Sequence, residues 1–156
     1  MIVVSDTSCV SNLLTIGHSG LLRELFGDII VPPAVERELR RFHTNIAFPF
    51  VVREPVDTPL LKKLFSELDA GEAEAISLAV DLKADRLLID EQAGRKVAVR
   101  EGLAIVGVVG VLIAAKQKGL VESIKPLLMR LQDEAGFRLS ATVQKAALEA
   151  VGESVS

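Results

Sequence analysis

Acidic residues that directly follow apolar runs are the residues of this 156-residue chain best suited to do chemistry. Asp6 ends the run Ile-Val-Val-Ser at positions 2–5, and Asp90 ends the run Leu-Leu-Ile at positions 87–89. Short runs of this kind are typical of buried strands. Parallel strands present their carboxyl ends at one edge of a sheet, where α/β proteins bind ligands, so we expect both aspartates there. Capping of a following helix is the purely structural alternative for Asp6.

Two glutamates on predicted helices extend this set of acids. In the helix predicted over residues 34–41, Glu38 shares a face with two apolar residues because of their i, i+3, i+4 spacing. A carboxylate on the apolar side of a helix needs a partner or a metal ion, unless it lies at an exposed boundary. Glu72 falls in the first turn of a helix that begins after Asp69, where it also fits a capping-box partner of that residue.

Four carboxylates gathered at one place suit a hard divalent cation. Oxygen ligands with open coordination sites favour Mg2+ or Mn2+, and without a cation they would repel one another and raise their pKa values. Such an ion orients water, increases its acidity and stabilises charge on a transferring phosphoryl group. The histidines His18 and His43 have no ligand-like spacing, and Cys9 is the single cysteine. Phosphodiester hydrolysis is therefore the reaction class that best uses an all-acid site.

The elements that would position these acids alternate between strand-like and helix-like segments. Strands are predicted over residues 2–4, 29–31, 87–89 and 103–106, with a brief edge strand within 48–55. Helices are predicted over residues 8–16, 19–26, 34–41, 59–65, 92–100, 111–118, 123–135 and 140–151, with a further one that follows Asp69. This alternation predicts an α/β fold with a parallel sheet.

The bulk composition predicts one aliphatic domain. Apolar residues make up 49% of the chain and aromatic residues 4%, so the core must be built from Leu, Val, Ile and Ala. The length suits a single domain over residues 1–152, followed by a frayed tail over 153–156. The lone Cys9 rules out an internal disulfide and a structural zinc site, which fits a cytoplasmic protein. Since no apolar run reaches membrane-spanning length, we expect no membrane attachment.

The formal net charge of −3 disfavours a nucleic-acid binder, because such proteins usually carry a basic footprint. Acids that bind divalent cations would, however, leave the rest of the surface close to neutral. The acidic balance therefore does not exclude a nucleic-acid substrate.

Taken in order, the motifs of the chain resemble the PIN-domain family, and within it the prokaryotic VapC-like, DUF3368-type branch. The resemblance rests on a strand followed by Asp6-Thr7-Ser8, on Pro33 five residues before Glu38-Leu39, on Gly71-Glu72-Ala73-Glu74-Ala75-Ile76, and on Leu88-Ile89-Asp90-Glu91. The pair Gly94-Arg95, the glycine-rich turn over 107–110 and the link Gly136-Phe137-Arg138-Leu139-Ser140 also resemble that branch. Together these segments span nearly the whole chain.

This resemblance implies an α/β/α sandwich with a central parallel sheet and the activity of a Mg2+- or Mn2+-dependent endoribonuclease. Metal-activated water would attack the RNA phosphodiester, with no covalent enzyme intermediate. It also implies the toxin of a VapBC-like toxin–antitoxin pair, with an antitoxin protein as partner and a homodimer as the assembly. Carried over by position, the catalytic and metal-binding residues are Asp6, Glu38, Glu72 and Asp90.

Departures from the family pattern leave two of these ligands open. Many PIN toxins have Asp at the position of Glu72, so Glu74 is a second candidate there. Many have Thr-x-Asp where this chain has Ile89-Asp90-Glu91, so Glu91 is a second candidate beside Asp90.

Three further residues are candidates to contact RNA. The hydroxyl groups of Thr7 and Ser8 are suited to hydrogen-bond a metal-bound water or a phosphate. Arg95, one turn into the helix after Asp90, is suited to meet a phosphate, although an arginine that merely lies on the surface is the simpler interpretation.

A PIN-like module that dimerises and partners an antitoxin-like protein, without meaningful cleavage, is the main alternative to a nuclease. The presence of all four acids favours the nuclease. A receiver-like phosphotransfer domain also places acids at strand ends. It would carry a lysine at a later strand end, whereas the strand predicted over 103–106 ends in Gly107.

Overall fold

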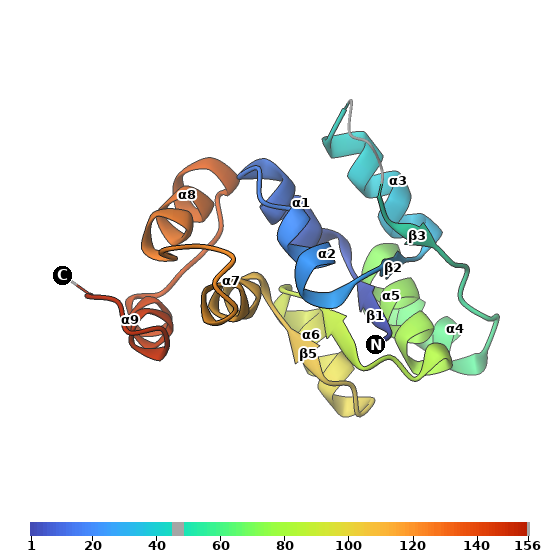
Figure 1. Ribbon diagram of the computed structural model, residues 1–156. Helices are drawn as coiled ribbons and strands as arrows, with labels where there is room; N and C mark the ends of the chain where they lie inside the picture. The colour runs from blue at the N-terminus through green and yellow to red at the C-terminus, as the bar shows by residue number, and fades with distance from the viewer. Residues whose placement is uncertain (45–48, 156) are drawn as a thin grey trace.

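A five-stranded, all-parallel sheet forms the centre of the computed structural model, which describes residues 1–44 and 49–155 (Figure 1). The strands are β1 (Val3–Ser5), β2 (Ile29–Val31), β3 (Val51–Val52), β4 (Arg86–Leu88) and β5 (Ile105–Val106). They lie in the order β3-β2-β1-β4-β5, so the first strand is the central one. The edge strand expected within 48–55 is β3, and Phe48 lies outside the described residues.

Helices cover both faces of this sheet. They are α1 (Thr7–Thr15), α2 (Gly20–Phe26), α3 (Pro33–Phe42), α4 (Pro59–Glu67), α5 (Ala70–Leu82), α6 (Gln92–Arg100), α7 (Val108–Gln117), α8 (Lys125–Ala135) and α9 (Ala141–Ala150). Figure 1 shows α7, α8 and α9 on one side of the strands and α4 and α5 on the other. The α/β/α sandwich expected from the sequence is confirmed. No helix in the two described ranges is long and apolar enough to cross a membrane.

The sheet divides the aliphatic core into two clusters. Val3 and Leu88 belong to the cluster on the side of α1, α7 and α8, whereas Val4 and Leu87 belong to the cluster on the side of α5. This alternation is the period of two that a strand imposes on its side chains. The buried face of α5 is rich in alanine, which lets this helix approach the sheet closely.

Local capping residues set the start of several helices. The side chains of Thr58, Asp69 and Ser140 each accept a hydrogen bond from a backbone N–H in the first turn of α4, α5 and α9, respectively. Each side-chain oxygen satisfies an N–H that has no partner within its helix. The cap at Asp69 confirms the helix start that the sequence predicts there.

Two helices begin two or three residues away from their predicted starts because distant carboxylates bind their first amides. α7 begins at Val108 rather than at 111, since the Asp90 carboxylate accepts hydrogen bonds from the Val108 N–H at 3.0 and 3.1 Å. α8 begins at Lys125 rather than at 123, since the Glu153 carboxylate accepts hydrogen bonds from the Ile124 and Lys125 N–H groups. Neither partner can be found from the local pattern of the helix that it binds.

Glu153 is also the first residue of the tail that we expected to be frayed. Its carboxylate accepts a hydrogen bond from the Ser123 hydroxyl at 2.5 Å and lies 3.5 Å from the Lys116 ammonium. Burial alone would raise the pKa of Glu153, but the hydrogen bonds from Ser123 and the two amides of α8 lower it to about 2. Glu153 is therefore anchored rather than frayed, and residue 156 lies outside the described residues.

Candidate active site

A polar cavity of about 480 Å³ opens at the edge of the sheet where β1 ends. Its wall carries three of the four predicted acids, Asp6 after β1, Glu38 from α3 and Glu72 from α5. The other lining residues are Thr7, Ser8, Ser11, Asn12, Phe42, Asp69 and Glu91. Segments that lie far apart in the sequence thus meet at the carboxyl edge of the parallel sheet.

Asp6 is a buried carboxylate held by hydroxyl and amide donors. The residue is 1% exposed, and Ser8 Oγ donates to its Oδ1 and Oδ2 at 3.2 and 3.1 Å. The Cys9 N–H donates to Oδ1 at 3.5 Å, so Asp6 also caps α1, as its structural alternative predicts. Burial raises the pKa of Asp6 well above its usual range, and the nearby charges of Asp90 and Glu72 raise it further. Among the described residues, no Lys, Arg or His side chain forms an ion pair with Asp6.

Glu38 reaches the cavity from α3 and is oriented by two neighbours. Thr7 Oγ1 donates a hydrogen bond to Glu38 Oε2 at 2.5 Å. A Cβ atom at Gly71 would lie 2.7 Å from Glu38 Oε1, so glycine at this position of α5 leaves room for the carboxylate. Glu36 instead pairs with Arg40 on the outer side of the helix. Glu38 therefore faces inward, as its helical spacing predicts.

Glu72 lies between α5 and α6, close to other acids. Burial raises its pKa to about 7, and the carboxylates of Asp69, Glu91 and Glu38 contribute to the rise. A Cβ atom at Gly94 would lie 2.8 Å from Glu72 Oε2, so a second glycine makes room for a carboxylate of this cavity. Glu72 is therefore held among like charges that only a cation or a proton can relieve.

Glu74 and Glu91, the second candidates for metal ligands, occupy different places. Glu74 Oε1 accepts a hydrogen bond from the Ala34 N–H at 3.2 Å, at the start of α3, and does not line the cavity. Glu91 lies on the cavity wall, and its charge acts on Glu72. The arrangement therefore favours Glu72 over Glu74 and keeps Glu91 as a candidate.

Asp90 faces away from this cavity. It lines two neighbouring hollows, and its carboxylate accepts the hydrogen bonds from the Val108 N–H that start α7. Burial raises its pKa to about 6, although the Val108 amide and the Arg95 guanidinium lower it in part. The charge of Asp90 still acts on Asp6 and raises its pKa. Three of the predicted acids thus share one wall, and the fourth turns toward α7.

The three residues expected to contact RNA donate hydrogen bonds to other groups of the protein in this structure. Thr7 and Ser8 donate their hydroxyl hydrogens to the cavity carboxylates described above. Arg95 is half-buried, and its Nη1 donates to the Ile89 carbonyl at 2.9 Å. Contact of these three side chains with RNA stays a prediction.

The donor set of the cavity fits a hard divalent cation in its chemistry. The candidate ligands are all carboxylates, which Mg2+ and Mn2+ prefer, and the raised pKa values of Asp6 and Glu72 reflect burial among like charges. Across residues 1–44 and 49–155, no three His, Cys, Asp or Glu side chains are arranged to hold a metal ion.

Three lining residues lie outside the motifs on which the sequence-based prediction rests: Ser11, Asn12 and Phe42. Ser8, Ser11 and Asn12 recur at i, i+3 and i+4, so helical spacing identifies them as one polar face of α1. Phe42 is 66% exposed at the end of α3, and no local pattern marks it. The His43 Nε2 and Ser11 Oγ atoms are 2.7 Å apart, so His43 links the end of α3 to α1.

Comparison with known proteins identifies the family. The chain matches the family model DUF3368, described as a PIN domain, over residues 2–153. No curated protein matches the chain. The family match covers nearly all of the sequence, agrees with the parallel α/β architecture and indicates a nuclease-type fold. The chain belongs to the PIN-domain family.

Proposed function

We propose that this chain is a hydrolase, a divalent-metal-dependent endoribonuclease that acts as the toxin of a VapBC-like toxin–antitoxin pair. One observation carries the proposal: Asp6 is a buried carboxylate in a polar cavity shared with Glu38 and Glu72, and no cation of the described chain forms an ion pair with it. A buried charge of this kind needs a partner. On a nuclease-type fold, a divalent metal ion would supply that partner and a phosphodiester would be the substrate.

Asp6, Glu38 and Glu72 would hold Mg2+ or Mn2+, and Asp90 would contribute its charge from the adjacent face. A divalent ion bound there would increase the acidity of water and stabilise negative charge on the phosphodiester. The ligands differ in how they are prepared for this task. Asp6 is rigidly held by its helix cap, whereas Glu72, with a pKa of about 7, holds a proton much of the time near neutral pH when no cation is close.

Two hydroxyl groups orient the candidate metal ligands through hydrogen bonds. Thr7 donates to Glu38 and Ser8 donates to Asp6, so both carboxylates keep lone pairs free for the cavity. Groups that orient metal ligands in this way typically change metal affinity by about 10–100-fold when they are removed. We therefore assign Thr7 and Ser8 a positioning role in addition to any contact with RNA.

The toxin role, the antitoxin partner and the homodimer rest on the family resemblance, and the cytoplasmic location rests on the single cysteine. A product of the adjacent gene that co-purifies with this chain and suppresses its cleavage of RNA would be the expected antitoxin. Light scattering of the purified chain would test the homodimer.

Calorimetry with Mn2+ tests the metal site directly. After treatment with a chelator, the wild type is expected to bind Mn2+, and Asp6→Asn is expected to stay folded and lose that binding. Asp28→Asn makes the same change at an exposed residue just before β2, at the opposite edge of the sheet, and should bind like the wild type. Cleavage of single-stranded RNA should then require Mg2+ or Mn2+. Mn2+ binding that persists in Asp6→Asn would contradict the proposed site.

A binding module without cleavage is the second candidate. It is favoured by the lack, among the described residues, of three ligating side chains already arranged around one point. A well-folded wild type that binds no Mn2+ and cleaves no RNA, but forms a complex with an antitoxin-like protein, would establish this function instead.

A further inference from the structure

The acidic cavity continues into a longer groove along the carboxyl edge of the sheet. Ser8, Asn12 and Glu91 line both the cavity and a second hollow of about 540 Å³. Asp90 and Arg138 line both this second hollow and a third one of about 550 Å³. The three hollows therefore adjoin and form one groove, which leads from the acids to the loop between α8 and α9.

The loop at the far end of the groove presents Arg138 in a fixed way. Gly136 ends α8 in the left-handed conformation with a φ of 64°, and the Phe137 N–H donates to the Leu131 carbonyl at 3.0 Å. Phe137 and Leu139 both pack against the core cluster on this side of the sheet. Arg138 lies between them and is exposed. Its two inward-facing neighbours thus hold this arginine at the rim of the groove.

Two arginines line the groove, and the fold uses only one of them. The Arg95 guanidinium donates to the Ile89 carbonyl, and its charge lowers the pKa of Asp90. Arg138 makes no hydrogen bond or ion pair within the described portion of the chain, and it is not among the charges that act on Asp90. A cation that is held in position and has no partner in the protein is available to an anionic ligand.

We propose that this groove binds single-stranded RNA on one side of the cleaved phosphodiester, and that Arg138 contacts a backbone phosphate of that strand. This inference rests on the proposed ribonuclease function and adds a substrate-positioning residue to it. A guanidinium binds a phosphate through two parallel N–H donors, so one arginine can fix the position of the backbone. Phosphate contacts position a strand without reading its bases, so Arg138 should act on RNA of any sequence.

The position and polarity of the groove favour a nucleic-acid strand over a protein partner. The groove begins at the carboxylates that would act on the scissile phosphodiester, so a bound strand must leave the cavity along its walls. The middle hollow offers hydroxyl and amide groups, such as those of Ser8, Asn12 and Gln92. The far hollow adds apolar side chains, among them Phe137 and Val143, to its polar groups. The chain carries a net charge of −3, so attraction of RNA depends on a local cation.

Binding measured without cleavage isolates the groove. In the Asp6→Asn background, fluorescence anisotropy with a labelled oligouridylate is expected to show about tenfold weaker binding for Arg138→Ala. Loss of one phosphate contact to single-stranded RNA should also reduce the slope of log K against log salt by about 0.7. Arg138→Lys keeps the charge and should keep that slope. An Asp6→Asn protein that does not bind the oligouridylate, or binding that Arg138→Ala leaves unchanged, overturns the proposal.

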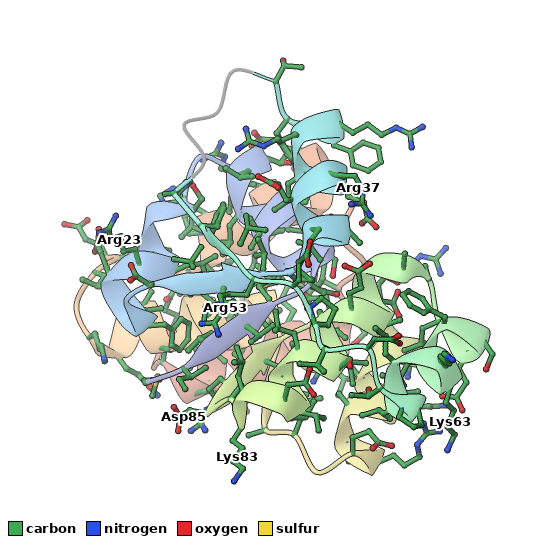
Figure 2. The ribbon with its side chains drawn as sticks, turned by 90° about the vertical axis from the view of Figure 1, so that its right-hand side faces the viewer. Arg23, Arg37, Arg53, Lys63, Lys83 and Asp85 are labelled. Atoms are coloured by element: carbon green, nitrogen blue, oxygen red, sulfur yellow. The ribbon has the colours of Figure 1, made fainter. Side chains whose placement is uncertain are left out.

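Arg23→Ala is the matched control for this experiment. α2 leads directly into β2, so Arg23 lies at the edge of the sheet where the strands begin. Figure 2 shows Arg23 on the opposite side of the view from Arg37 of α3. In the same background, Arg23→Ala should bind the oligouridylate as its parent does. A weakening equal to that of Arg138→Ala would assign the effect to overall charge and overturn the proposal.

Steady-state cleavage separates this inference from the function on which it rests. If the wild type cleaves RNA, Arg138→Ala should raise KM about tenfold and leave kcat nearly unchanged, because binding is lost equally from the ground state and the transition state. Cleavage with an unchanged KM overturns the inference while the ribonuclease function stands. Binding of the oligouridylate that depends on Arg138, with no cleavage in Mg2+ or Mn2+, supports the groove and overturns the ribonuclease function.

Discussion

Asp6 and Asp90 follow neighbouring strands in the same way, yet they enter different environments. Each ends an apolar strand and precedes a helix, and β1 and β4 are paired in parallel. Asp6 lies in the acidic cavity with Ser8 as its donor, whereas Asp90 leaves on the other side and binds the first amide of α7. Two similar sequence motifs at one edge of a sheet therefore do not supply two equivalent ligands.

A difference of one residue in register explains this divergence. Ser5 is paired with Leu88, and the Asp6 N–H donates to the Leu88 carbonyl at 2.9 Å. Asp6 is thus level with Ile89, and Asp90 lies one residue further along the chain. Because side chains alternate between the two faces of a sheet, Asp6 leaves with Ile89 on the side of α5, and Asp90 leaves on the opposite side.

We expect the loss of Asp6 and the loss of Asp90 to affect RNA cleavage by different amounts. Asp6→Asn should lower kcat by roughly three orders of magnitude, because it removes a buried ligand from the cavity. Asp90→Asn should lower kcat by roughly tenfold, as expected for a group that influences the metal ligands without binding the metal itself. Single-turnover cleavage of a labelled single-stranded RNA measures both rates. Equal losses would show that Asp90 enters the cavity during the reaction.

Substitution of two glycines can disturb the acidic cavity and the contact of Asp90 with α7 separately. A Cβ atom at Gly71 would lie 2.7 Å from Glu38 Oε1, and one at Gly107 would lie 2.5 Å from Asp90 Oδ1. Gly71→Ala should weaken Mn2+ binding by about tenfold, because it displaces a carboxylate of the cavity. Gly107→Ala should lower the melting temperature, because it disturbs the contact that starts α7, and should leave Mn2+ affinity unchanged. Calorimetry that finds weaker Mn2+ binding in both variants would contradict the comparison.

Without metal, both aspartates should reduce stability, and Asp6 should do so more strongly. Asp6→Asn is expected to raise the melting temperature by about 2–4 °C, or roughly 1 kcal/mol, because an amide replaces a buried charge and still accepts from Ser8. Asp90→Asn should raise it less, since the Val108 amide and Arg95 already stabilise that charge. Thermal melts in a chelator at mildly alkaline pH measure both shifts. A lower melting temperature for Asp6→Asn would mean that the protein itself stabilises the Asp6 carboxylate of the wild type.

Local patterns predict an element well where neighbouring residues in the chain set its limits. β2 and α6 have the predicted bounds, because Pro32 follows the strand and Gly102 closes the turn after the helix. α7 begins three residues earlier than predicted, because its first amide binds Asp90, which lies 18 residues upstream. A contact between two elements cannot be predicted from the spacing within either of them.

The same distinction decides how much of the site could be predicted. The inward direction of Glu38 follows from its own helix, because i, i+3 and i+4 spacing fixes one face. The direction of Asp90 depends on the register of β1 against β4, which involves two segments far apart in the sequence. The exposure of Arg138 results from the packing of its two neighbours against the core, which sequence spacing does not show.

The smallest expected effect is a difference in pH dependence between Glu72 and Asp90. The pKa of Glu72 is raised from 4.5 to about 7 and that of Asp90 from 3.8 to about 6, in both cases chiefly by burial. The folded protein therefore holds a proton at each carboxyl more tightly than the unfolded chain does. As pH rises from the unfolded to the folded pKa, each group lowers the free energy of unfolding. For Glu72 this window extends to about pH 7, and for Asp90 it ends at about pH 6.

Melting curves at a series of pH values in a chelator separate the two groups. The stabilisation that Glu72→Gln gives over the wild type should still grow between about pH 6 and about pH 7, where that of Asp90→Asn has levelled off. Because Glu72 is half-buried and solvent screens its charge, we expect a difference of about 1–2 °C. Mn2+ added to the wild type should remove the decline of its melting temperature with rising pH, since a bound cation favours the charged carboxylate. A decline that persists in Glu72→Gln would point to the more deeply buried Asp6 instead, and Glu72→Gln combined with Asp6→Asn would then abolish it.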